Sequence, residues 1–153
     1  MERPALSSAV AHLVLVRRML AHATTEASAS LSHIAPVFRV ADLSQSLAFY
    51  RDQLGFTVEF VYKSFYAGVC REGCHIHLKC SPATPRDQTA FEREEQIDAY
   101  IAVHNAETLA ERFASAGVAF VVPLRHMPYG TEFYVRDPDG YVLGFVQSTP
   151  STR

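Results

Sequence analysis

The sequence has 153 residues, 48% of them hydrophobic and 20% charged, which is enough for one compact domain with its own core. A second full domain is not expected at this length. The 14 Lys and Arg residues against 16 Asp and Glu give a formal charge of -2, which leaves no positive excess to bind a nucleic-acid backbone.

Apolar runs and cysteines narrow the class of protein further. The longest apolar run, Ala9–Val16, is interrupted by His12 and is much shorter than the ~20 residues that cross a bilayer, so we expect no membrane span. Three cysteines are an odd number and too few for a disulfide scaffold, and they favour a reducing, cytoplasmic setting: Cys70, Cys74 and Cys80.

The N-terminal residues 1–32 are expected to form a separate element. Between Ser7 and Ala23, apolar residues recur at the spacing of an amphipathic helix, and the stretch TTEASAS that follows is typical of a linker. We assign no chemistry to this helix.

One structural unit then occurs twice in the sequence. In the first copy, an alternating strand over residues 35–42 leads into a helix that Asp42 caps and Gly55 ends. Further strands follow, with a hairpin that turns at Gly73. This copy is therefore a βαβββ unit over residues 33–80.

The second copy repeats this order of elements over residues 97–147. A strand over residues 98–105 leads into a helix that Asn105 caps and Gly117 ends, and the last hairpin turns at Gly140. We expect an α+β domain in which two tandem βαβββ units form a curled mixed sheet with a concave ligand pocket. Residues 81–96 are predicted to be a linker between the copies, and residues 148–153 a tail.

Two stretches carry a resemblance to a known family. The run VFRVADLSQSLAFYRDQLGF in the first copy and FYVRDPDGYVLGFVQ in the second are similar to the vicinal oxygen chelate superfamily, which includes glyoxalase I, extradiol dioxygenases and bleomycin-resistance proteins. The resemblance covers residues 33–147. It implies the paired βαβββ fold but no single function, because one fold hosts both catalysts and binding proteins.

In metal-dependent members of this superfamily, two strand positions in each copy supply the metal ligands. The resemblance places these positions at Ala35, His77, Asp98 and Gly144. Ala35 and Gly144 have no side-chain donor, so at most two ligands remain where a catalytic site needs about three. We therefore expect no metal or other cofactor, and a small-molecule binding protein that sequesters its ligand, an antibiotic or an aromatic metabolite, as bleomycin-resistance proteins do.

An enzyme is the alternative interpretation. In that case a lyase, isomerase or dioxygenase would recruit zinc, nickel, manganese or iron through His77 and Asp98, with a further donor such as His33 or His75. The resemblance also implies a homodimer, because relatives close the concave face and the exposed sheet edges with a partner.

Strand alternation selects the candidate ligand-binding residues. We expect Arg39 to bind a ligand carboxylate, and Tyr100, Tyr62 and Phe133 to stack on a planar ligand. The full candidate set comprises Arg39, Tyr62, His75, His77, Asp98, Tyr100, Phe133 and Gly144. Each has an ordinary structural alternative, such as an internal ion pair for Arg39 and core packing for the aromatic residues.

The cluster Cys74, His75, His77 and Cys80 resembles a structural zinc site in composition only. In a strand, alternate side chains point to opposite faces, so the two cysteines cannot converge with the two histidines on one ion. We therefore predict no zinc held by these four residues.

Overall fold

The computed structural model describes residues 30–82, 89 and 93–150. The chain divides into two units, residues 1–32 and 33–153, and all helices and strands given below belong to the second unit. The helix predicted over Ser7–Ala23 lies outside the described residues, as does most of the linker predicted over residues 81–96.

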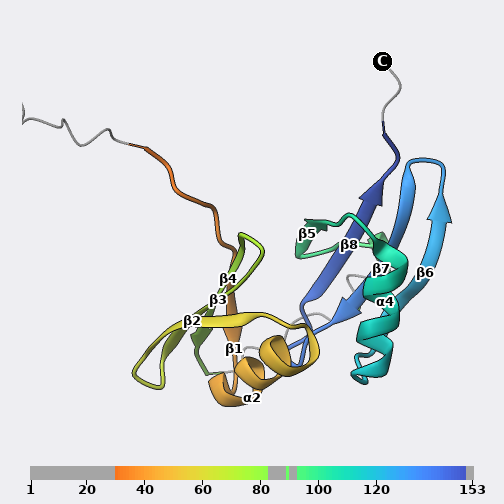
Figure 1. Ribbon diagram of the computed structural model, residues 1–153. Helices are drawn as coiled ribbons and strands as arrows, with labels where there is room; N and C mark the ends of the chain where they lie inside the picture. Colours follow the sequence, from red (N-terminus) through yellow and green to blue (C-terminus); the bar gives the residue numbers. More distant parts are fainter. Residues whose placement is uncertain (1–29, 83–88, 90–92, 151–153) are drawn as a thin grey trace, which may run out of the picture. The chain divides into compact units, whose positions relative to one another are not determined.

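The first repeat contains four strands and one helical segment (Figure 1). In chain order the elements are β1 (Val37–Val40), α2 (Leu43–Ala48), the π-helical turn η1 (Phe49–Gln53), β2 (Thr57–Tyr62), β3 (Tyr66–Arg71) and β4 (Cys74–Cys80). The strands form a four-stranded sheet in the order β1-β4-β3-β2, with β1 parallel to β4 and the other pairs antiparallel.

The second repeat has the same topology. Its elements are β5 (Ala99–Ala102), α4 (Ala106–Ser115), β6 (Phe120–Met127), β7 (Gly130–Arg136) and β8 (Val142–Ser148). They form a second four-stranded sheet in the order β5-β8-β7-β6, again with the first strand parallel to the last. The predicted α+β fold of two tandem βαβββ units is therefore confirmed, with two curled mixed sheets in place of one continuous sheet.

Both helices begin and end where the sequence predicts. The Asp42 carboxylate accepts a hydrogen bond from the Gln45 amide at 3.0 Å, and the Asn105 side chain accepts one from Thr108 at 3.0 Å. The terminal glycines Gly55 and Gly117 have φ angles of 73° and 77°, in the left-handed region that glycine adopts without strain.

The first helix differs from the prediction in its second half. It is α-helical only to Ala48 and continues as the π-helical turn η1, in which the Leu54 amide donates to the Phe49 carbonyl at 3.2 Å. The wider turn holds the consecutive residues Phe49 and Tyr50 so that both are buried. Tyr50 is thereby directed toward the second repeat, where its hydroxyl donates to Asp137 at 2.9 Å.

One hydrophobic core lies between the helices and the sheets, and it includes residues of both repeats. In the second repeat the rings of Phe113, Phe133 and Phe145 pack with centroid distances of 5.1–5.8 Å. Tyr141 stacks on Phe38 of the first repeat at 4.1 Å, so aromatic packing crosses between the copies.

The turn between β7 and β8 joins the repeats through hydrogen bonds as well. The Tyr141 hydroxyl accepts from the Arg39 amide at 2.8 Å, and the Asp139 carboxylate accepts from the Ala41 amide and the Ser46 hydroxyl at 2.7 and 2.9 Å. The turn predicted from Pro138-Asp139-Gly140 therefore also supplies, with Tyr141, polar contacts between the two repeats. None of the helices described is long and apolar enough to span a membrane.

Candidate functional site

The two repeats place equivalent residues at equivalent points of their sheets. In the parallel pair of the first sheet Val37 lies opposite His77, and in the second sheet Tyr100 lies opposite Gly144. The strand registers therefore make His77 and Gly144 equivalent positions of the two repeats, as the alignment of the turn glycines predicts.

The four symmetrical positions do not fit a metal ion. Ala35, which precedes β1, and Gly144 have no side chain that could bind a metal. One carboxylate oxygen of Asp98 accepts a hydrogen bond from the Val142 amide at 2.8 Å. A side chain added at Gly144 would meet Ile97 Cδ1 at 3.0 Å, so this point of the second sheet is already filled by apolar packing.

Around Gly144 the second sheet covers its face opposite α4 with its own side chains, while Tyr100 on the edge strand β5 stays exposed. An apolar cluster covers this part of the face, comprising Ile97, Val121, Val122, Tyr134 and Val142. Beside the cluster, the buried Glu132 carboxylate accepts from Arg125 at 2.8 Å and from the Tyr129 hydroxyl at 3.1 Å. The Arg125 guanidinium donates hydrogen bonds to the Glu95 and Glu132 carboxylates, which raises its pKa further above the ordinary value.

The first sheet has a more open face, which carries histidine and aromatic side chains. We call it the histidine face and define it by His33, Phe60, Tyr66, His75 and His77. The Tyr66 hydroxyl shares a hydrogen bond with His77 Nδ1 at 2.9 Å, and the Phe60 ring contacts the His77 ring edge-on at 5.4 Å between centroids. His33 stacks on His75 at 4.0 Å.

The flatness of this face at its centre depends on Gly68. The Phe60 ring lies directly over Gly68 and would collide with a Cβ atom there. Phe60 is 40% exposed and stacks with Tyr66 at 6.0 Å between centroids, so an aromatic surface remains open beside His77. Contiguous exposed apolar surface is a candidate binding surface.

The structure places the other predicted site residues as follows. Arg39 is exposed on β1, and Tyr62 and Tyr100 are 58% and 57% exposed on different sheets. The prediction for Phe133 was wrong, because it is fully buried in the core against Phe113 and cannot reach a ligand. Both faces of β7 carry buried side chains, so alternation gave no contrast from which to assign it.

Two members of the histidine face, Phe60 and Tyr66, were missed in the sequence. A β-bulge between Val58 and Phe60 shifts the register of β2 and brings Phe60 onto this face, where strict alternation would place only one of the neighbours Glu59 and Phe60. For Tyr66 a signal existed, because the hairpin register predicted from Gly73 places it on the face of His77.

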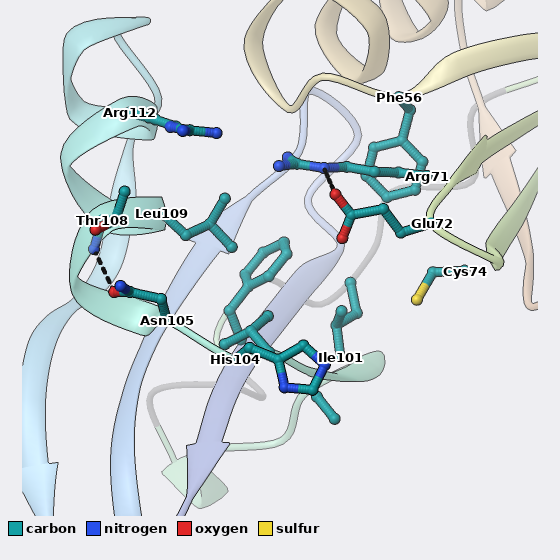
Figure 2. Close-up of a pocket in the computed structure, with 13 residues that line it drawn as sticks. Phe56, Arg71, Glu72, Cys74, Ile101, His104, Asn105, Thr108, Leu109 and Arg112 are labelled. Carbon is teal, nitrogen blue, oxygen red and sulfur yellow. Dashed lines mark hydrogen bonds and ion pairs between the residues drawn. The ribbon is translucent and has the colours of Figure 1, made fainter.

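A cleft of about 370 Å³ lies on the helix side of the domain, between the two repeats (Figure 2). The β3–β4 hairpin contributes Arg71 and Glu72 to its wall, and α4 contributes Thr108 from its first turn and Arg112 from its last. One Arg71 nitrogen donates to the Leu54 carbonyl at 2.6 Å. This cleft was not predicted, since the pocket was expected on the concave side of the sheets.

Solved structures with this fold are numerous. A bleomycin-binding protein from the bleomycin producer Streptomyces verticillus, complexed with copper(II)-bleomycin, is 26% identical over 78% of this chain and 98% of its own, with a TM-score of 0.61. UcmS2 is 24% identical over 78% of this chain and 99% of its own, with a TM-score of 0.62.

A third structure, a glyoxalase/bleomycin resistance protein/dioxygenase from Alicyclobacillus acidocaldarius, is 16% identical over 76% of this chain and 91% of its own, with a TM-score of 0.65.

No curated protein matches the chain. The family model of the Glyoxalase/Bleomycin resistance protein/Dioxygenase superfamily matches residues 30–145. With its repeated βαβββ topology and this match, the chain belongs to the glyoxalase/bleomycin resistance protein/dioxygenase superfamily.

Proposed function

We propose that this protein binds and sequesters an aromatic or otherwise largely apolar small molecule, such as an antibiotic, without a metal at the four symmetrical positions. The observation that carries the proposal is the contrast between the two sheets. The second sheet covers its face around Gly144 with its own apolar side chains and leaves Tyr100 exposed on the edge strand β5, whereas the first leaves Phe60, Tyr66 and His77 together as an open aromatic and polar surface.

The chemistry of the histidine face suits a planar ligand with polar substituents. Phe60 and Tyr66 offer ring faces for stacking, and the hydrogen bond to Tyr66 holds the His77 ring in one orientation, with Nε2 as its second polar atom. The similarity to the bleomycin-binding protein of Streptomyces verticillus supports a ligand-binding role of this kind.

The enzyme alternative has less support. His77 shares its Nδ1 with Tyr66, and Asp98 is engaged with the backbone of Val142. Two opposing positions without donor atoms leave no set of three ligands there, so we derive no metal-dependent step at these residues.

We further propose that the protein is a cytoplasmic homodimer. Three free thiols are compatible with a reducing compartment. On the first sheet Val37 and Val61 are 51% and 52% exposed, and Tyr62 adds further apolar surface that a second copy could cover. Light scattering at micromolar concentration tests this, because a stable particle of 17.0 kDa would contradict a dimer.

Calorimetric titration of the full-length protein with metal-free bleomycin and a panel of planar aromatic antibiotics, in the presence of EDTA, tests the binding function. We expect saturable binding by at least one probe. Phe60→Ala should weaken it roughly 5- to 150-fold, as expected for a lost aromatic contact worth about 1–3 kcal/mol. Binding that EDTA abolishes, or that Phe60→Ala leaves intact, would contradict the proposal.

The matched control is Tyr100→Ala on the second sheet, since Tyr100 is an exposed strand aromatic like Phe60. Tyr100 was also predicted to stack on the ligand. A loss of affinity in this variant would extend the ligand site to both sheets, and an unchanged affinity would confine it to the histidine face.

A further inference from the structure

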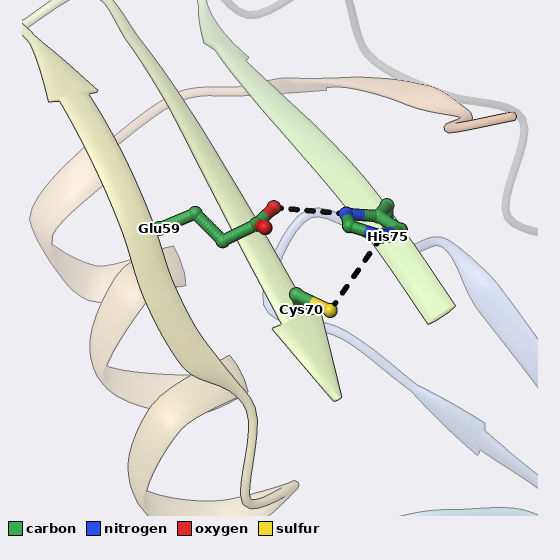
Figure 3. A group of neighbouring side chains, drawn as sticks. All are labelled: Glu59, Cys70 and His75. Atoms are coloured by element: carbon green, nitrogen blue, oxygen red, sulfur yellow. Dashed lines mark hydrogen bonds and ion pairs between the residues drawn. The ribbon is translucent and has the colours of Figure 1, made fainter. Parts of the chain in front are cut away.

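A thiol and an imidazole lie directly opposite each other near the turn of the β3–β4 hairpin. Cys70 on β3 pairs with His75 on β4 in the antiparallel register, and Cys70 Sγ lies 3.7 Å from His75 Nε2 (Figure 3). Directly opposed residues of two paired strands point to the same face of a sheet. Cys70 and His75 therefore lie on one face of the sheet, and Cys74 and Cys80 lie on the other.

A third donor comes from the adjacent strand. The bulge in β2 brings Glu59 to the same group, where its carboxylate lies 2.9 Å from His75 Nδ1. One ligand atom each from Glu59, Cys70 and His75 can be chosen so that all three lie within 4.8 Å of one another. Neighbouring strands thus supply three different metal-binding groups to one point.

The spacing suits a tetrahedral ion. With Zn–S bonds of about 2.3 Å and Zn–N bonds of about 2.0–2.1 Å, a tetrahedral angle at zinc separates sulfur and nitrogen by about 3.6 Å. The observed separation of Cys70 Sγ and His75 Nε2 is 3.7 Å. Little movement of these two side chains is therefore needed to bind zinc.

We propose that Cys70, His75 and Glu59 form a zinc site with three protein ligands and an open fourth position. On binding, the Cys70 thiol releases its proton to solvent and forms the Zn–S bond, His75 binds through Nε2, and Glu59 exchanges its hydrogen bond to His75 for a Zn–O bond. The thiolate and the carboxylate together neutralise the charge of the ion.

The surroundings of His75 and Glu59 favour binding of a metal ion. His33 stacks on the His75 ring at 4.0 Å and fixes its plane. The Glu59 side chain is 36% exposed, which leaves space for its carboxylate to move from His75 Nδ1 to the ion, while the His75 side chain is only 16% exposed. The site lies on one sheet and uses none of the four symmetrical superfamily positions, so it goes beyond the proposed function and shares only His75 with the histidine face.

Zinc alone is the probe for the test. The full-length protein, reduced and stripped of metal by a chelator, is titrated with ZnCl₂ in a calorimeter in two buffers of different ionisation enthalpy. We expect one equivalent to bind with micromolar or tighter affinity and with release of a thiol proton. Titration with Co²⁺ should produce the near-ultraviolet charge-transfer absorption of a cobalt–thiolate bond.

Substitutions identify the ligands. Changes next to a metal ligand already weaken metal binding roughly 10- to 100-fold, so Cys70→Ser, which removes the thiolate itself, should weaken it about 100-fold or more. Glu59→Gln should weaken it about 10-fold or more, and Cys74→Ser, four residues along the same hairpin, should leave it unchanged. Circular dichroism of the metal-free variants verifies that each is folded.

Two results would overturn the site. The first is the absence of stoichiometric zinc binding in the folded, reduced protein. The second is zinc binding that survives Cys70→Ser, or that Cys74→Ser abolishes equally, because the ion would then lie elsewhere. Neither result bears on binding of an organic ligand in EDTA, so failure of the zinc site and failure of the proposed function are distinguishable.

Discussion

The buried carboxylate of Asp137 provides the sharpest test of how the two repeats are held together. Asp137 is 4% exposed, and one of its oxygens accepts from the amides of Asp139 and Tyr141 at 2.9 and 2.8 Å. The other accepts from the Tyr50 hydroxyl of the first repeat at 2.9 Å. Burial raises the pKa of this carboxyl to about 6, although the hydrogen bonds that it accepts act in the opposite direction.

The raised pKa predicts an unusual dependence of stability on pH. In the unfolded chain the pKa of an Asp carboxyl is about 3.9, so between pH 4 and 6 the folded protein binds the proton of Asp137 more tightly than the unfolded chain does. The contribution of Asp137 to stability is therefore complete below pH 4 and is lost as the pH rises through about 6. Its total size is about 3 kcal/mol.

Asp137→Asn isolates this contribution. The amide oxygen can accept from Asp139 and Tyr141, and the amide nitrogen can donate to the Tyr50 oxygen, so the hydrogen bonds are preserved without a titrating group. Urea unfolding of both proteins from pH 4 to 8 should show the parent losing about 1.4 kcal/mol per pH unit relative to the variant between pH 4 and 6. A difference that stays constant with pH, or changes in the opposite direction, would refute the reasoning.

Three further variants test other parts of the structure. Tyr141→Phe removes the hydroxyl that accepts from the Arg39 amide and should lower the free energy of unfolding by about 1–2 kcal/mol in urea denaturation. A smaller effect would mean that a water molecule takes the place of the hydroxyl as acceptor. Asn105→Ala removes the N-cap of α4 and should cost about 1 kcal/mol in the same assay, with Asn105→Ser close to the parent as the control. Gly68→Ala should displace the Phe60 ring and weaken probe binding at least as much as Phe60→Ala, while an unchanged affinity would show that the ring position is irrelevant.

Much of the architecture could be predicted because its signals are local. Asp42 and Asn105 are polar caps before apolar helices, and Gly55 and Gly117 follow those helices in the left-handed conformation. Each of these residues acts within about one turn of chain. Repetition of the same signals in two copies then specified the topology, and the turn glycines specified which residues of the two sheets are equivalent.

The candidate site was harder to predict because it depends on irregular and nonlocal geometry. A bulge in β2 changes which side chains face the ligand side, and no residue type in the segment from Val58 to Phe60 marks it in advance. The hydrogen bond from the Val142 amide to one Asp98 carboxylate oxygen joins residues 44 apart in the sequence, so no local pattern could predict it.

The two repeats share a backbone but differ in the polar side chains that they carry at equivalent strand positions. His77 in the first sheet and Gly144 in the second occupy equivalent strand positions. Ile97 packs at Gly144, so the position is apolar and filled in the second sheet. In the first sheet His77 is polar and shares a hydrogen bond with Tyr66. A side chain that supplies a donor in only one of two related positions cannot complete a symmetrical metal site, yet it can still orient an organic ligand against an aromatic surface. The proposed binding surface therefore does not depend on paired donors, because Phe60 and Tyr66, from which it is built, lie outside the four symmetrical positions.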